Sequence, residues 1–325
     1  MKDFKDICRM SQQQVKDYMK EYLTSKQYEV INEDGFLYAK GTHPVLLLAH
    51  MDTVHKNKCT TIKEKKGRIS SPQGIGGDDR CGIFIIMNLV NELHCSVLLC
   101  EDEETGGVGA RKFAKTDYVK DLGVHYMVEF DRRGKDDAVF YSCDNKTFTE
   151  FITSETGFKE ARGSFSDISV VAPAAKIAAV NLSSGYYNAH TTEEYVEYNE
   201  MLDIIETAKA LIETETEEPF EYIEKKYEWN YNREYNYSRE YCGGFGYGGF
   251  GYQRKDNYAP SYKQQTFADY AARDFDINLE VVWIDEEGNE CVDDASGNTK
   301  TEAWTNFFLA NTNVCFDMIV DYSFC

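Results

Sequence analysis

The sequence VLLLAHMD at residues 45–52 combines the two features that decide the fold. Its first five residues form an apolar run of strand length without polar alternation, which is typical of a strand buried on both faces of a sheet. Two side chains suited to metal chemistry, His50 and Asp52, follow directly at the end of that run. We therefore expect a buried sheet with polar groups at the carboxyl ends of its strands.

The same pattern repeats along the first two-thirds of the chain. Further apolar runs of strand length occur at residues 96–100, 124–130 and 176–182. Helical spacing occurs at residues 12–23, 82–93, 107–115 and 199–213. An Asn-Glu-Asp-Gly turn between residues 28–31 and 36–39 predicts a hairpin. Strands alternating with helices predict a three-layer α/β fold, in which a mixed, mainly parallel sheet carries helices on both faces.

The composition changes after residue 217. Residues 221–262 contain ten of the 23 tyrosines, and the run GGFGYGGFGY occupies residues 243–252. A Tyr/Gly-rich segment of this kind cannot bury a compact core. We expect a main domain at residues 1–217, a low-complexity linker at 218–265 with self-association as an alternative role, and a small β-rich module at 266–325.

The composition also limits the classes of partner. A formal net charge of −21 argues against binding to nucleic acid, which needs a basic surface. The sequence has no run of about 18 apolar residues, so no membrane span is expected. Ten cysteines without close pairing, and a charged start at residues 1–6, predict a reducing and cytoplasmic setting without a secretory signal.

Two motifs offer candidate metal ligands in the first hundred residues. His50 can offer one ring nitrogen to a metal while Asp52 accepts the N–H of the other, although both could belong to an ordinary turn. In GIGGDDRCG (74–82), the adjacent carboxylates of Asp78 and Asp79 repel each other unless a cation neutralises them. Glycines would let the backbone approach that cation. The alternative is that Asp79 caps the following helix.

Three more polar positions follow predicted strands. EDEETGG (101–107) places four carboxylates after an apolar run, where one could remove a proton from water while its neighbour binds a metal. Asp131 and His190 follow later runs, although an Asp that ends a strand and a surface His are both common. Together these imidazoles and carboxylates suit an open zinc site. Two metals about 3.5–4 Å apart would need a bridging carboxylate, for which Asp78 is placed.

The motifs AHMDTV, GGDDRCG, EDEETGG, EFD and GYYNAH, in this order, resemble those of the co-catalytic zinc exopeptidases. This family includes peptidase T, bacterial zinc aminopeptidases, and related carboxypeptidases and deacylases. The resemblance covers residues of about 10–215 and implies that the main domain is catalytic. It also implies five ligands for two Zn²⁺, which Co²⁺ or Mn²⁺ could replace: His50 and Asp131 for the first, Glu104 and His190 for the second, and Asp78 for both.

The resemblance implies further roles. Glu103 would be the general base, Asp52 would orient His50, and the Asp78–Asp79 peptide would be cis. RGSFSD (162–167) resembles the RGGTD stretch of peptidase T, so Arg162 is a candidate for binding the substrate carboxylate. A plain surface arginine is the alternative.

Two spacings depart from the relatives that carry a second, lid domain. Only 58 residues separate Asp131 from His190, and Asp78 lies 26 positions after Asp52. We therefore expect a lidless, single catalytic domain, as in the single-domain zinc aminopeptidases. The expected activity is that of a metallo-exopeptidase, an aminopeptidase or a di/tripeptidase acting on peptides. The alternatives are an amidase or deacylase of N-acyl amino acids, and a degenerate exopeptidase fold that serves as a binding module.

Overall fold

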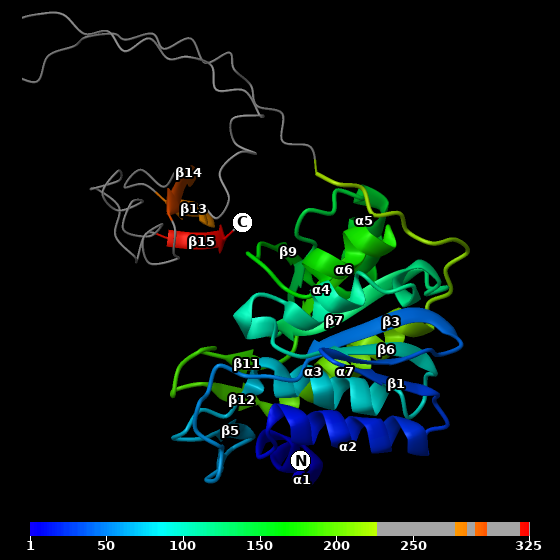
Figure 1. Ribbon diagram of the computed structural model, residues 1–325. Coiled ribbons are helices and arrows are strands. Elements are labelled where there is room, and N and C mark those ends of the chain that lie inside the picture. The colour runs from blue at the N-terminus through cyan, green and yellow to red at the C-terminus, as the bar shows by residue number, and fades with distance from the viewer. Residues whose placement is uncertain (226–276, 285–289, 298–318, 325) are drawn as a thin grey trace, which may run out of the picture. The chain divides into compact units, whose positions relative to one another are not determined.

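The computed structural model describes residues 1–225, 277–284, 290–297 and 319–324. They belong to two compact units, Met1–Lys225 and Lys226–Cys325. The first unit is built on an eight-stranded sheet (Figure 1). In spatial order its strands are β1 (Val30–Glu33), β2 (Phe36–Ala39), β6 (Cys95–Cys100), β3 (His43–His50), β7 (Tyr126–Arg132), β10 (Ala179–Ser183), β8 (Asp137–Val139) and β9 (Lys159–Ala161).

The sheet is mixed and mainly parallel, as predicted. β6, β3, β7 and β10 pair in parallel, and so do β8 and β9, whereas β2 and β8 run antiparallel to β6 and β10. β1 and β2 form the predicted antiparallel hairpin, which turns at Gly35 with φ +96°. Because β3, β6 and β7 are parallel, their carboxyl ends meet at one edge of the sheet.

Helices cover both faces of this sheet. One face packs against α1 (Lys2–Cys8), α2 (Gln12–Ser25), α3 (Gly77–Leu89), α5 (Lys146–Thr156) and α7 (Tyr198–Glu213). The other packs against α4 (Val108–Phe113) and α6 (Ile168–Ala175). The side chains of β3 alternate between the two cores: Val45 and Leu47 enter the first, and Leu46 and Leu48 the second. The predicted three-layer architecture is therefore confirmed.

A smaller antiparallel sheet lies beside the large one. Its strands, in spatial order, are β11 (Tyr186–Tyr187), β12 (Tyr195–Glu197), β5 (Arg68–Ser70) and β4 (Lys63–Lys65). β11 and β12 form a hairpin, and the loop between them carries His190. β12 follows the His190 loop and pairs with β5, which precedes the Gly-rich motif at residues 74–77. This pairing brings the loop and the motif together.

The first unit extends past the boundary expected at residue 217. The backbone N–H of Phe220 donates to the carbonyl of His125, and its ring stacks on that of Phe151. Glu221 and Glu224 form isolated antiparallel bridges with Ile177 and Cys143. The partly buried Phe220 side chain therefore packs residues 218–225 against the first unit.

The rest of the predicted linker, residues 226–265, lies outside the described residues. Its expected role in self-association therefore stays a prediction. In the second unit, β13 (Ile277–Ile284) pairs antiparallel with both β14 (Glu290–Gly297) and β15 (Ile319–Phe324). Leu279 and Val281 are buried there, whereas Val292 is exposed. The described part of the expected C-terminal module is thus a three-stranded antiparallel sheet.

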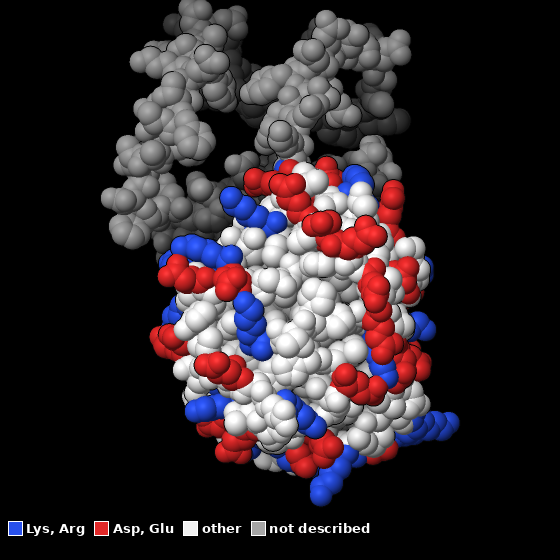
Figure 2. Space-filling view, turned by 90° about the vertical axis from the view of Figure 1, so that its right-hand side faces the viewer, with Lys and Arg blue, Asp and Glu red and all other residues white. Residues whose placement is uncertain are grey.

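No helix in the described ranges is long and apolar enough to cross a membrane. Figure 2 shows one face of the first unit, on which acidic and basic side chains are interspersed around uncharged areas. That face carries no continuous basic patch of the kind that binds nucleic acid.

Candidate metal centre

Five segments that are distant in the sequence meet at the carboxyl edge of the parallel strands. His50 is the last residue of β3, and Asp131 is the sixth residue of β7. Glu104 lies in a short 3₁₀ turn (Glu103–Thr105) after β6. Asp78 lies at the start of α3, and His190 in the loop of the β11–β12 hairpin.

The Asp78 carboxylate lies between two imidazoles. Its Oδ1 is 2.9 Å from His50 Nε2, and its Oδ2 is 3.2 Å from His190 Nε2. His50 Nε2 also lies 3.5 Å from Asp131 Oδ1, and His190 Nε2 lies 3.1 Å from Glu104 Oε1. Asp78 thus joins two groups of three side chains, each made of one imidazole and two carboxylates.

Asp79 has a different role from Asp78. Its Oδ1 accepts a hydrogen bond from Gly82 N at 2.9 Å, and its Oδ2 accepts one from His50 N at 3.2 Å. Asp79 also comes within metal-ligand range of His50 and Asp131, but these backbone donors already engage both of its oxygens. Asp79 thus accepts from the first turn of the regular helix in the way expected of a cap, although α3 as a whole begins after Gly76, while Asp78 faces the imidazoles. The peptide bond between them is cis.

Asp52 fixes the orientation of the His50 ring. Its Oδ1 lies 3.1 Å from His50 Nδ1, which directs Nε2 toward Asp78. The same carboxylate accepts hydrogen bonds from the backbone N–H groups of Glu103 (3.0 Å) and Glu104 (3.1 Å). Asp52 therefore positions both the imidazole and the carboxylate loop after β6. A carboxylate behind a ligand histidine is a common feature of metal sites.

The electrostatics of the centre are those of crowded carboxylates. Burial opposes protonation of His50, but Asp131, Asp52 and Asp78 together hold its pKa well above the usual value. Hydrogen bonds to Asp78 and Glu104 raise the pKa of His190 to about 11. In both cases the protonated imidazole balances part of the negative charge of the neighbouring carboxylates.

Glu103 is a largely enclosed carboxyl group among other carboxylates. Burial raises its pKa to about 10, and the nearby carboxylates of Asp131, Asp167 and Glu104 act in the same direction, opposed by His50. Burial likewise raises the pKa of Asp131 to about 7. Both carboxyl groups therefore hold a proton more readily than free carboxyl groups, because burial and neighbouring carboxylates disfavour their charged forms.

The donor set fits divalent cations. Imidazole nitrogen and carboxylate oxygen are ligands that zinc accepts, and none of the three groups within ligand range contains a cysteine. Glu104 Oε1 is buried without a hydrogen-bond donor, although it lies in ion-pair range of His190. The buried Arg80 guanidinium donates to the carbonyls of Met51 and Asp52 rather than to a carboxylate of the centre.

Three residues around Asp131 were not predicted from the sequence. Asn181 Oδ1 accepts a hydrogen bond from Asp131 N at 2.9 Å. The Ser166 hydroxyl lies 3.4 Å from Asp131 Oδ2 and donates to the buried carboxylate of Glu129. Glu129 and Ser166 lie inside the quoted motifs EFD and RGSFSD, and Asn181 lies in the expected strand at 176–182, but nothing in the sequence assigns these three side chains a role beside Asp131.

Arg162 directly follows the edge strand β9 and is exposed. Four positions later, Ser166 enters the network around Asp131. The segment that begins at Arg162 therefore leads into the centre.

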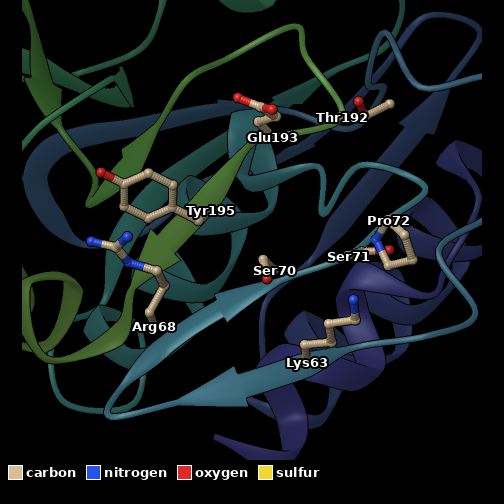
Figure 3. A pocket seen from close by; sticks show the side chains of 8 residues that line it. All are labelled: Lys63, Arg68, Ser70, Ser71, Pro72, Thr192, Glu193 and Tyr195. Atoms are coloured by element: carbon tan, nitrogen blue, oxygen red, sulfur yellow. The ribbon is translucent and has the colours of Figure 1, made fainter.

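A pocket of about 270 Å³ lies beside the loop that carries His190 (Figure 3). It is lined by Lys63, Arg68, Ser70, Ser71, Pro72, Thr192, Glu193 and Tyr195. The Arg68 guanidinium stacks on the Tyr195 ring at 3.9 Å and pairs with Glu197. These contacts join the β4–β5 hairpin to the chain that follows His190.

No protein-family model matches the sequence, and no curated protein does. Among solved structures, the chain is similar to the aminopeptidase PepT from Bacillus cereus, with 16% identity and a TM-score of 0.55 over 65% of this chain and 96% of that one. It is also similar to a tripeptidase from Staphylococcus aureus, with 12% identity and a TM-score of 0.52 over 64% and 95% of the two chains. The described first unit has the fold of these two peptidases.

Proposed function

We propose that this protein is a metal-dependent exopeptidase that removes residues from the end of short peptides. The observation that carries the proposal is the Asp78 carboxylate, which lies between His50 and His190 with Glu103 close by. The fold shared with an aminopeptidase and a tripeptidase supports the same reaction class.

The residues that would hold two divalent cations, with zinc first among them, follow from the distances around Asp78. His50 and Asp131 would hold the inner cation, Glu104 and His190 the outer one, and Asp78 would bind both. When bound, such a pair of cations lowers the pKa of water and polarises a carbonyl group.

Glu103 would move the proton. It accepts a proton from the attacking water and returns it to the leaving amine, as a general base and then a general acid. Its pKa of about 10 reflects burial among carboxylates, and added positive charge in the centre would lower this pKa. Asp52 holds the backbone of Glu103 and therefore the position of this base.

We propose an aminopeptidase or di/tripeptidase as the specific activity. The carboxylates that surround the centre would attract the ammonium group at the start of a peptide. Arg162 is the candidate for a carboxylate at the other end, because it is exposed and leads into the Ser166 segment. The same arginine would suit an N-acyl amino acid, so deacylation is the second candidate activity.

The test uses the purified full-length chain loaded with Zn²⁺. Dipeptides, tripeptides, N-blocked peptides and N-acetyl amino acids are incubated with it, and the products are separated by liquid chromatography. Free peptides should be cleaved best, and the variant Glu103→Gln should lose about 10²- to 10⁴-fold in kcat while it still binds metal. Preference for N-acetyl amino acids would select the deacylase. Full activity of the Glu103→Gln variant, or no hydrolysis by the loaded chain, would overturn the proposal.

A further inference from the structure

Glu194 is a buried carboxylate that holds the backbone next to Asp78. Its side chain has no solvent exposure. Oε1 accepts a hydrogen bond from Asp78 N at 3.0 Å, and Oε2 accepts one from Gly76 N at 2.8 Å. His55 Nε2 lies 2.7 Å from the same Oε2. A buried carboxylate with three N–H partners is strongly fixed in place.

The glycines of the motif at residues 74–77 make room for these contacts. A Cβ at Gly74 would come within 2.2 Å of the His55 ring. A Cβ at Gly77 would come within 2.7 Å of Tyr186 Cβ in β11. The glycines therefore let the loop pack closely against His55 and the β11–β12 hairpin. The sequence alone suggested that these glycines let the backbone approach a cation. The structure gives a different reason for glycine at these positions, which is close packing against other parts of the chain.

Glu194 also belongs to the segment that carries His190. Both residues lie between β11 and β12, four positions apart. One carboxylate thus ties this segment to the backbone of Asp78. It fixes the relative placement of Asp78 Oδ2 and His190 Nε2, which lie 3.2 Å apart.

We propose that Glu194, held by His55, is a positioning residue that builds the outer metal position. The inference rests on the proposed metal centre and deepens it. His50 and Asp131 come from neighbouring strands of the large sheet, so the inner position has its own support. Loss of Glu194 would free both the His190 loop and the Asp78 backbone, and so weaken the outer position more than the inner one, to which Asp78 also contributes.

The experiment measures metal binding rather than activity. The metal-free full-length chain is titrated with Zn²⁺ by calorimetry, and Co²⁺ binding is followed by its visible spectrum. The wild type should bind two cations. Glu194→Ala should bind one cation nearly as tightly as the wild type and the second about 10- to 100-fold more weakly, as expected when a supporting residue is removed.

Two further variants keep the test decisive if Glu194→Ala fails to fold. Glu194→Gln keeps one oxygen but turns an N–H group toward a backbone donor, so its second cation should also bind more weakly. His55→Ala leaves both backbone hydrogen bonds and should weaken that cation less than Glu194→Gln does. The matched control is Glu193→Ala, whose carboxylate lines the exposed pocket of Figure 3. It should bind two cations like the wild type.

Two cations bound with wild-type affinity by Glu194→Ala, or by Glu194→Gln where the first does not fold, would overturn the inference. An equal loss of both cations would also overturn it, since that would indicate general unfolding of the centre. A wild type that binds two cations but cleaves no peptide would reject the proposed function and leave the role of Glu194 standing.

Discussion

The two oxygens of Asp78 face different imidazoles, with Oδ1 2.9 Å from His50 and Oδ2 3.2 Å from His190. An Asn side chain at this position would have one oxygen and no negative charge, so it could not bind both cations. We expect Asp78→Asn to lower the affinity for at least one Zn²⁺ by more than about 100-fold, beyond the effect of losing a supporting residue. Calorimetric titration measures this, with the exposed Asp121→Asn as control. Two tightly bound cations in Asp78→Asn would contradict the bridging role.

Asp52 links His50 to the loop that carries Glu103. Asn in its place keeps the approximate shape but removes the negative charge behind the imidazole. We expect Asp52→Asn to weaken binding of the inner cation by about 10- to 100-fold. Because the backbone of Glu103 also loses a charged acceptor, kcat at saturating Zn²⁺ should fall as well. A change in metal affinity with no change in kcat would show that Asp52 supports only the imidazole.

The stability of the metal-free chain should fall as pH rises from 5 to 8. Burial raises the pKa values of Asp131 and Asp167 to about 7 and that of Glu103 to about 10. The folded chain therefore keeps protons that the unfolded chain releases near pH 4, and this stability is lost as pH rises through the folded pKa values. Each group contributes up to about 1.4 kcal/mol per pH unit.

His190 acts in the same direction above its ordinary pKa, because its folded pKa is about 11. Asp78, whose pKa is lowered, acts in the opposite direction only in acid. Thermal unfolding of chelated protein across this pH range is the measurement. Added Zn²⁺ should stabilise the chain more at pH 8 than at pH 5, since the cations replace protons. A melting temperature of the chelated chain that rises over this range would be evidence against the carboxylate-rich centre.

Lys16 and Glu101 form a buried pair at the base of the carboxylate loop. Their charged atoms are 2.8 Å apart, and the side chains are only 6% and 12% exposed. Lys16→Met leaves Glu101 buried without its cation and should destabilise the fold by about 3–5 kcal/mol. The control is Lys40→Met, which removes a pair exposed by 49% and 91% and should change stability by about 0–1 kcal/mol. Urea denaturation measures the free energy of unfolding of both variants. Equal losses of stability would contradict the expectation that the buried pair contributes more than the exposed one.

The apolar strands and the convergence of their ends were predictable because both follow from local patterns. β3 and β6 each contain a run of apolar residues, and parallel strands bring their carboxyl ends together. The start of β10 was expected at residue 176 but lies at Ala179, because α6 continues to Ala175 and ends at Lys176 with φ +59°. The helix α6 itself was not predicted, because its short apolar stretch contains Pro173 and shows no clear helical periodicity.

Glu194 could not be identified from sequence. It stands in a Thr-Thr-Glu-Glu run that has the composition of an exposed loop. Its burial depends on the pairing of β12 with β5, which joins segments more than a hundred positions apart. The close packing of Gly74 on His55 is hidden for the same reason, because a glycine in a sequence does not reveal which side chain occupies the space it leaves.

The two histidines differ in their access to water. The His50 side chain is fully enclosed, whereas that of His190 is 56% exposed. A chelator arriving from solvent would therefore meet the outer position first, and the inner ion would leave only after its neighbour. Mild chelation should then yield a homogeneous, half-loaded form instead of a mixture of empty and full molecules. The proposed peptidase activity would then be lost in two resolvable stages, and resupply of metal would restore it in the reverse order.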